Sequence, residues 1–195
     1  MFKIKTLLLT ALVLTLTGCT FGRNKVDYSS LGPELHIKTD KSVAVAVYDM
    51  RPYVLSEEKK NTFVGVTRGT YYNSFDMSTV SGSALATDLQ RSVLSALANS
   101  NIVASAKTFD PPLKAGSSNQ RLLVLKINEW KTDTYFSTQF VYDMNASVID
   151  ENGKVLGTQH ARNDEQIQNF QDSGKQALKD LLASPQIIRA LTANP

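Results

Sequence analysis

The sequence predicts an α+β fold, a two-layer sandwich in which two main helices cover one face of a mostly antiparallel sheet of about four to five strands. Segments with apolar residues at every second position alternate along the chain with segments of helical periodicity. Between two strand-like segments stands Asn152-Gly153, a strong hairpin signal. Together these observations favour strands that return on themselves, with helices packed against them.

The first strand is expected at 42–48, where Val43, Val45 and Val47 share one face and small alanines lie opposite. Small residues on the second face suggest close packing against a helix. The remaining elements are expected as a helix at 82–99, a short strand at 101–107, meander strands at 121–130, 135–149 and 154–162, a helix at 164–183, and one or two further turns at 186–192.

The strand expected at 135–149 has the clearest pattern of all. Its polar residues occupy one face, as in a half-buried antiparallel strand. The residues assigned to its apolar face are Phe136, Phe140, Tyr142, Met144, Ala146 and Val148.

Residues 49–80 are expected to form a long loop, with a short strand at 62–67 inside it. A connection of this length is usually functional or disordered. It concentrates Tyr and Arg, the residues most enriched at binding hot spots. We therefore predict a partner-binding surface there, with a lid folded over the sheet as the alternative. Its candidate residues are Arg51, Tyr53, Arg68, Tyr71, Tyr72 and Phe75.

The amino-terminal segment has the order of a secretory signal. Lys3 and Lys5 precede an apolar, leucine-rich run, which is followed by small residues and then by Cys19, the single cysteine of the 195 residues. The run is shorter than the approximately 20 apolar residues of a transmembrane helix. The sequence therefore predicts a signal peptide at 1–18.

The tetrapeptide Leu-Thr-Gly-Cys that ends at Cys19 resembles the lipobox of bacterial lipoproteins. The resemblance implies that the thiol receives a diacylglycerol and that the new amino group is acylated. It also implies an outer-membrane address on the periplasmic side, because Thr20 stands where Asp would retain the protein in the inner membrane. We expect a lipidated tether at 19–41 and a single α+β periplasmic domain at 42–195.

The order of elements resembles small envelope lipoproteins of the YajG type, and more loosely the lipopolysaccharide-assembly lipoprotein LptE and transport-auxiliary lipoproteins. Likeness to LptE would imply a plug or chaperone for an outer-membrane barrel. Only the motif at Cys19 is matched, so no other functional residue follows from the resemblance.

Composition bears on the remaining classes of function. The net charge is +3, and Lys3 and Lys5 supply two of these charges, so nothing indicates the concentrated basic face of a nucleic-acid-binding protein. The two histidines and the scattered carboxylates form no catalytic or metal motif. We expect no enzyme, metal or cofactor beyond the lipid. The predicted role is that of a structural or interaction subunit with envelope protein partners. The alternative is a lipid or glycolipid transport accessory that binds an acyl chain.

Overall fold

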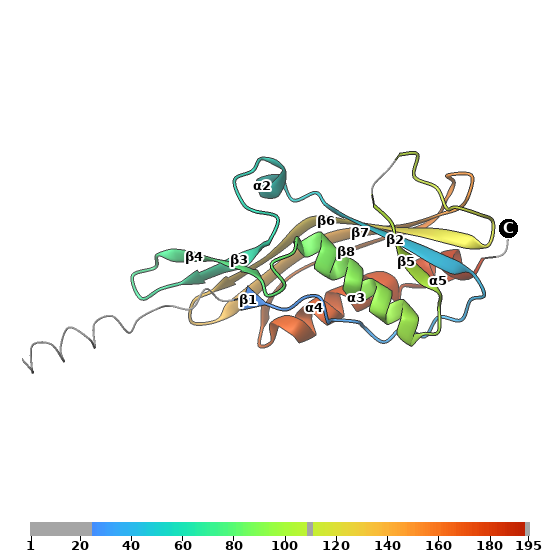
Figure 1. The fold of residues 1–195 in the computed structure, drawn as a ribbon. Coiled ribbons are helices and arrows are strands. Elements are labelled where there is room, and N and C mark those ends of the chain that lie inside the picture. The colour runs from blue at the N-terminus through green and yellow to red at the C-terminus, as the bar shows by residue number, and fades with distance from the viewer. Residues whose placement is uncertain (1–24, 109–110, 194–195) are drawn as a thin grey trace, which may run out of the picture.

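The computed structural model describes residues 25–108 and 111–193 (Figure 1). The predicted signal peptide, Cys19 and Thr20 lie outside the described residues. The described part confirms a mixed α+β fold, but the expected four to five strands are too few, because eight strands form one sheet.

The strands are β1 Lys25–Val26, β2 Ser42–Asp49, β3 Phe63–Arg68, β4 Ser74–Thr79, β5 Ala104–Ala106, β6 Gln120–Thr134, β7 Thr138–Ile149 and β8 Val155–Ile167. The helices are α2 Pro52–Leu55, α3 Leu85–Asn99, α4 Phe170–Leu182 and α5 Pro185–Thr192.

Strand β6 organises the sheet. One of its edges pairs antiparallel with β7 from Leu122 to Thr134, and β7 in turn pairs with β8. The other edge is divided between two parallel partners: β2 pairs with it as far as Ile127, and β3 pairs with it from Thr132. Strand β5 lies beyond β2, whereas β4 and β1 lie beyond β3. The sheet is therefore mixed rather than mostly antiparallel.

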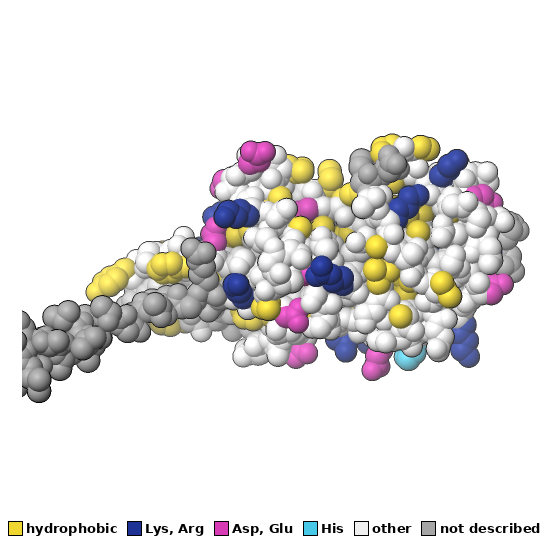
Figure 2. All heavy atoms as spheres, viewed as in Figure 1, with side chains coloured by type: hydrophobic (Ala, Val, Ile, Leu, Met, Phe, Trp, Pro, Cys, Tyr) yellow, Lys and Arg dark blue, Asp and Glu magenta, His cyan; other side chains and the backbone are white. Residues whose placement is uncertain are grey.

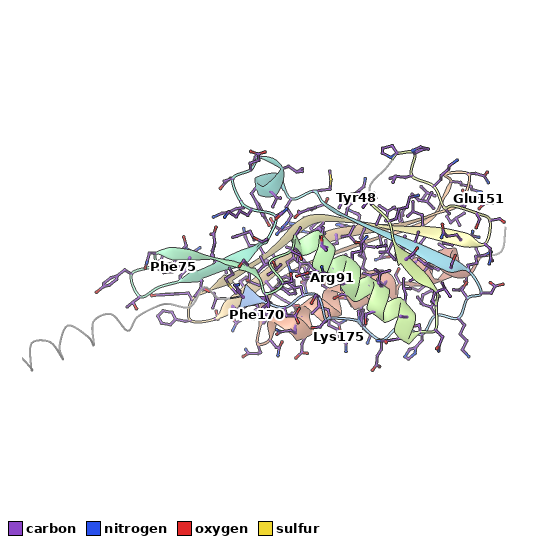
Figure 3. All side chains as sticks on the ribbon, viewed as in Figure 1. Tyr48, Phe75, Arg91, Glu151, Phe170 and Lys175 are labelled. Carbon is purple, nitrogen blue, oxygen red and sulfur yellow. The ribbon has the colours of Figure 1, made fainter. Side chains whose placement is uncertain are left out.

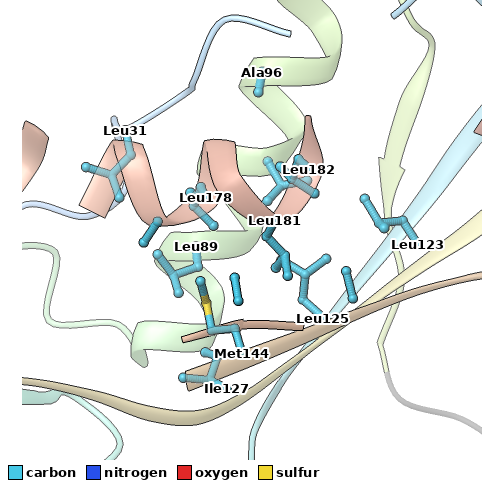
Figure 4. Close-up of a cluster of buried hydrophobic side chains, with 14 of the residues drawn as sticks. Leu31, Leu89, Ala96, Leu123, Leu125, Ile127, Met144, Leu178, Leu181 and Leu182 are labelled. Atoms are coloured by element: carbon cyan, nitrogen blue, oxygen red, sulfur yellow. The ribbon is translucent and has the colours of Figure 1, made fainter. Parts of the chain in front are cut away.

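The main core lies between this sheet and the longer helices. Apolar residues recur at helical spacing in α3 and α4, and their inward rows meet the inward faces of the strands in one buried cluster. Figure 4 shows Leu89 of α3 and Leu181 of α4 near Met144 and Ile127. Trp130 is fully buried in the same cluster, with its ring centroid 5.1 Å from that of Phe140.

The described part of the predicted tether packs on the domain. Tyr28, Leu31, Leu35 and Ile37 are all at most 6% exposed and belong to the main core. The hydroxyl of Ser92 on α3 donates to the Tyr28 carbonyl at 2.7 Å and accepts from the Leu31 amide at 3.0 Å. The segment was expected to be loose because its apolar residues follow no regular period; tertiary contacts bury them instead.

The expectation of a long loop at 49–80 is also wrong. This segment contains α2 and the antiparallel hairpin of β3 and β4, which projects beyond the rest of the sheet (Figure 1). The short strand expected at 62–67 is confirmed as β3. The helix expected from 164 begins only at Phe170, because β8 continues to Ile167 alongside β7.

Candidate functional site

Two turns leave the sheet side by side at one end. Residues 69–73 connect β3 to β4, and residues 135–137 connect β6 to β7. Because β3 runs parallel to β6, with Thr67 opposite Thr134, the two turns project in the same direction. Segments far apart in the sequence thus form one end of the molecule.

These turns carry a cluster of exposed rings, which we call the tip cluster: Tyr71, Tyr72, Phe75, Tyr135 and Phe136. Tyr71 and Phe136 are 93% and 92% exposed, and the other three are between 38% and 60% exposed. Tyr72 packs edge-to-face on Tyr135 at 5.4 Å between centroids, and Tyr135 contacts Phe136 at 4.1 Å. Hydrophobic side chains are visible on the projecting hairpin in Figure 2, and Figure 3 marks Phe75 there. Exposed rings gathered at one end of a domain make this end a candidate contact site.

One ion pair links the β3–β4 hairpin to the β6–β7 hairpin. The Arg68 guanidinium donates two hydrogen bonds to the Asp133 carboxylate, of which the Nε–Oδ1 bond is 2.7 Å long. The central carbon of the Arg68 guanidinium, Cζ, also lies 4.4 Å from the centroid of the Tyr72 ring. The hydrogen bond from Arg68 lowers the pKa of Asp133, and the same bond raises the pKa of Arg68. No other charged residue occurs in 67–75 or 132–138, so these two stretches together carry no net charge.

The backbone of the first turn presents Tyr71 at its apex. The Gly69 amide donates to the Asn73 carbonyl and the Gly69 carbonyl accepts from the Tyr72 amide, each at 2.8 Å. A side chain at Gly69 would place its Cβ 2.7 Å from Oδ1 of Asn73, so the Asn73 side chain would have to move. Tyr72 has a left-handed φ of 64°, which completes the reversal.

Arg51, a predicted contact residue, lies elsewhere and has no exposed surface. Its guanidinium donates to both oxygens of Asp49, at 2.7 and 2.6 Å, and to the carbonyls of Phe63 and Trp130 at 2.6 and 3.3 Å. Burial alone would lower the pKa of Arg51, but the hydrogen bond and charge of Asp49 raise it. Arg51 therefore has a structural role, and its assignment to a contact surface was wrong.

Tyr53 is likewise separate from the tips. Its hydroxyl donates to the Glu129 carboxylate, and its ring packs edge-to-face on Phe63 at 5.5 Å between centroids. Burial raises its pKa above the ordinary value. Four of the six predicted contact residues are thus brought together at the tips, and they are Arg68, Tyr71, Tyr72 and Phe75.

Sequence reasoning missed Tyr135 and Phe136. Phe136 was assigned to the buried face of a strand, yet it is 92% exposed, because β6 extends to Thr134 and β7 begins only at Thr138. Of the residue types typical of turns, the intervening three residues contain only Ser137 and no Gly, Pro, Asn or Asp. The strand-like pattern before and after these residues is too long for one strand, so the chain must reverse near this point.

Two surface hollows lie outside the 69–73 and 135–137 turns. One, of about 560 Å³, is bordered by Lys59, Asp76 and Phe75 among others, and a second, of about 660 Å³, lies between 35–39, Ser100 and α5. Across residues 25–108 and 111–193, no three His, Cys, Asp or Glu side chains are grouped so that they could hold a metal ion. Within the same described ranges, no helix has the length and apolar character needed to cross a membrane.

Comparison with known proteins gives no match to a family model and none to a curated protein. Solved structures with some likeness include a DUF330-family protein from Xanthomonas campestris (12% identity, covering 83% of this chain and 80% of that one, TM-score 0.43). Another is a PelC dodecamer from Paraburkholderia phytofirmans (12% identity, covering 83% of this chain and 95% of that one, TM-score 0.46). A third is the lipoprotein GNA1162 from Neisseria meningitidis (14% identity, covering 71% of this chain and 92% of that one, TM-score 0.31). At such identities, and with TM-scores below 0.5, these likenesses assign neither a family nor a function to this chain.

Proposed function

We propose that this chain is a non-enzymatic lipoprotein, anchored through Cys19 to the periplasmic side of the outer membrane. It acts as a structural and interaction component of a cell-envelope assembly. The signal-like order of residues 1–18 and the lipobox-like motif at Cys19 support the anchor, and Thr20 supports the outer-membrane address. Two or more acyl chains hold a protein at a membrane essentially permanently.

The tip cluster is the observation that carries the proposal. It concentrates exposed rings on two braced hairpins, at the end of the domain where the described chain begins with β1. Aromatic residues contribute most of the contact energy at many binding surfaces. We therefore propose the tip cluster as the surface through which the anchored domain meets the envelope.

Two buried ionisable groups, Asp88 and Arg51, have structural partners, which supports a non-enzymatic role. Asp88, fully buried in the first turn of α3, accepts from the Ser81 hydroxyl at 2.7 Å and from Arg91 at 2.9 Å. Burial raises the pKa of Asp88. Its position suits a carboxylate that stabilises a helix amino terminus. Arg51 similarly satisfies carbonyls within the fold.

The alternative role, as an acyl-chain carrier, calls for a cavity of a few hundred cubic ångströms lined mainly by apolar groups. The two hollows described above have the volume, about 560 and 660 Å³, but their borders include Lys59, Asp76 and Lys38. These borders do not favour an acyl ligand.

The anchor is tested with two single variants of the full chain. Cys19→Ser should abolish labelling by a fatty-acid probe and leave an unprocessed precursor on a gel. Thr20→Asp is the matched control: labelling should persist, while the protein shifts toward inner-membrane density fractions. Normal labelling of Cys19→Ser would overturn the anchor. Unchanged fractions for Thr20→Asp would overturn only the outer-membrane address.

A further inference from the structure

The direction of β1 shows from which side the chain reaches the domain. Lys25 and Val26 pair in parallel with Ser78 and Thr79 of β4. Strand β4 runs from the 69–73 turn into the body of the sheet, so β1 runs inward from the tips as well (Figure 1). Lys25, the first described residue, is therefore the end of β1 that faces the tips.

The covalent distance from Cys19 to Lys25 limits where an anchor can lie. Six residues span at most about 20 Å when fully extended. Ser78, opposite Lys25, is four residues from Ser74 at the base of the turn, which is about 13 Å along a strand. The anchor can thus lie level with the tips. The far end of the sheet lies farther away, because the strand registers place Lys25 level with Tyr142, and Ile149 is about 24 Å further along β7.

The chemistry of the tips suits the interface of a bilayer. Tyrosine has an apolar ring and a polar hydroxyl, and it is enriched where headgroups meet acyl chains. Tyr71 and Phe136, the most exposed rings, come from different turns, and the contact of Tyr72 with Tyr135 joins these turns. The only charges, those of Arg68 and Asp133, neutralise each other, so insertion buries no unpaired charge.

We propose that the tip cluster sits in the interface of the membrane that holds the anchor, with its rings at the boundary between headgroups and acyl chains. This inference rests on the proposed function, since acylated Cys19 brings the tips to the membrane. The molecule then has two attachments on one side, a lipid and a ring cluster. The long sheet then points away from the membrane.

The test measures depth in the membrane with spin labels. Because acylation consumes Cys19, the only cysteine, an introduced thiol is the single labelling site. Ser137→Cys places a nitroxide in the tip turn and keeps every ring, and Asn152→Cys is the matched control in the turn at the other end of β7. Both are exposed. The full lipidated chain is reconstituted into vesicles of phosphatidylethanolamine and phosphatidylglycerol.

We expect the label at 137 to be accessible to oxygen and protected from a water-soluble nickel chelate, at a depth of about 5–10 Å or less. The label at 152 should be fully accessible to the chelate. Equal chelate access at 137 and 152 in protein whose mass shows the acyl chains would overturn the inference and leave the anchor intact. An unmodified Cys19 would overturn both. Protection at 137 in native membranes but not in pure lipid vesicles would assign the tips to a protein and also overturn it.

Removing rings tests their role directly. In the Ser137→Cys background, Phe136→Ser alone should raise chelate access several-fold, and adding Tyr71→Ser and Tyr72→Ser should raise it to the level at 152. Phe136 is almost fully exposed, so the single variant keeps the fold even if the triple variant does not. Unchanged access in the folded single variant would show that this ring is not held in lipid, contrary to the proposal.

Discussion

At the scale of single residues, Arg51 fills the place where β6 changes partners. The β2 pairing ends at Ile127 and the β3 pairing begins at Thr132, so the backbone between them lacks a strand on that edge. The Arg51 guanidinium occupies this gap and donates to the carbonyls of Phe63 and Trp130. Buried carbonyls need donors, and one fork-shaped side chain supplies them here.

Arg51→Met should therefore lower the free energy of unfolding by about 3–5 kcal/mol, because it leaves Asp49 without its partner and the buried carbonyls without donors. Denaturant titration measures this change. Arg162→Met is the control, since Arg162 is exposed on β8, and its effect should stay within about 0.5 kcal/mol. Similar losses in the two variants would show that the guanidinium in the gap contributes nothing specific.

Sequence reasoning could identify which residue types suit a contact surface, but not which of them are exposed. Arg51 and Arg68 stand in the same segment near tyrosines, and nothing local distinguishes them. Burial of Arg51 depends on β6, whose Trp130 lies 79 residues away. Exposure of Tyr71 depends only on a local turn, and its role as a contact residue stays a prediction.

At the scale of elements, the segment from Lys25 to Lys41 belongs to the core. Its buried side chains contact α4 as well as α3: a Cβ on Gly174 would lie 3.0 Å from Leu31 and 3.1 Å from Tyr28. The ring of Tyr28 also packs edge-to-face on Trp130 at 5.1 Å between centroids. The segment therefore closes the helical side of the core.

A chain that starts at Lys41 should fail to melt cooperatively, whereas one that starts at Lys25 should melt cooperatively. Burying an apolar side chain of this size contributes about 1.5–3 kcal/mol. Losing Tyr28, Leu31, Leu35 and Ile37 removes stability comparable to the approximately 5–15 kcal/mol of a whole domain. Circular dichroism during heating measures the difference. Equal melting curves would mean that the segment is dispensable, as its lack of periodicity first suggested.

The elements predicted well are those with a strong local period. The valine alternation at 42–48 became β2, and the leucine spacing at 82–99 became α3. Strand β1 was missed because its two residues show no period, and β4 was missed because its alternation is limited to Phe75 and Met77. Both exist through pairing with a neighbour: β4 pairs with β3, and β1 pairs with β4. The pairing of β1 with a strand about 50 residues further along the chain is invisible to a local pattern.

At the scale of the whole molecule, the described chain begins and ends at different places along the sheet. Lys25 lies beside β4 near the tips, whereas the carbonyl of Ala193 accepts from Arg121 at the start of β6, toward the other end. Strands β6 and β7 connect these ends (Figure 1). The tip cluster could not be assembled from sequence, because Tyr72 and Tyr135 meet only through the parallel pairing of β3 with β6.

This arrangement allows the effect of the short connection to be separated from that of the rings. Inserting about 20 Gly and Ser residues before Lys25 gives a flexible link of roughly 25 Å average span. If the rings hold the tips in the interface, the Ser137→Cys nitroxide should remain protected from the nickel chelate despite the longer link. The same insertion combined with Tyr71→Ser, Tyr72→Ser and Phe136→Ser should bring chelate access at 137 to the level at Asn152→Cys.

The opposite result would contradict the role proposed for the rings. Full chelate access at 137 after the insertion alone, with all rings present, would show that only the six-residue distance from Cys19 keeps the tips at the membrane. The rings would then have no affinity of their own for lipid. Protection that survives the insertion requires a second attachment, because a flexible link of this length no longer fixes either the height or the orientation of the domain. The exposed rings of the two turns lie within reach of the anchor and have the chemistry to provide that attachment.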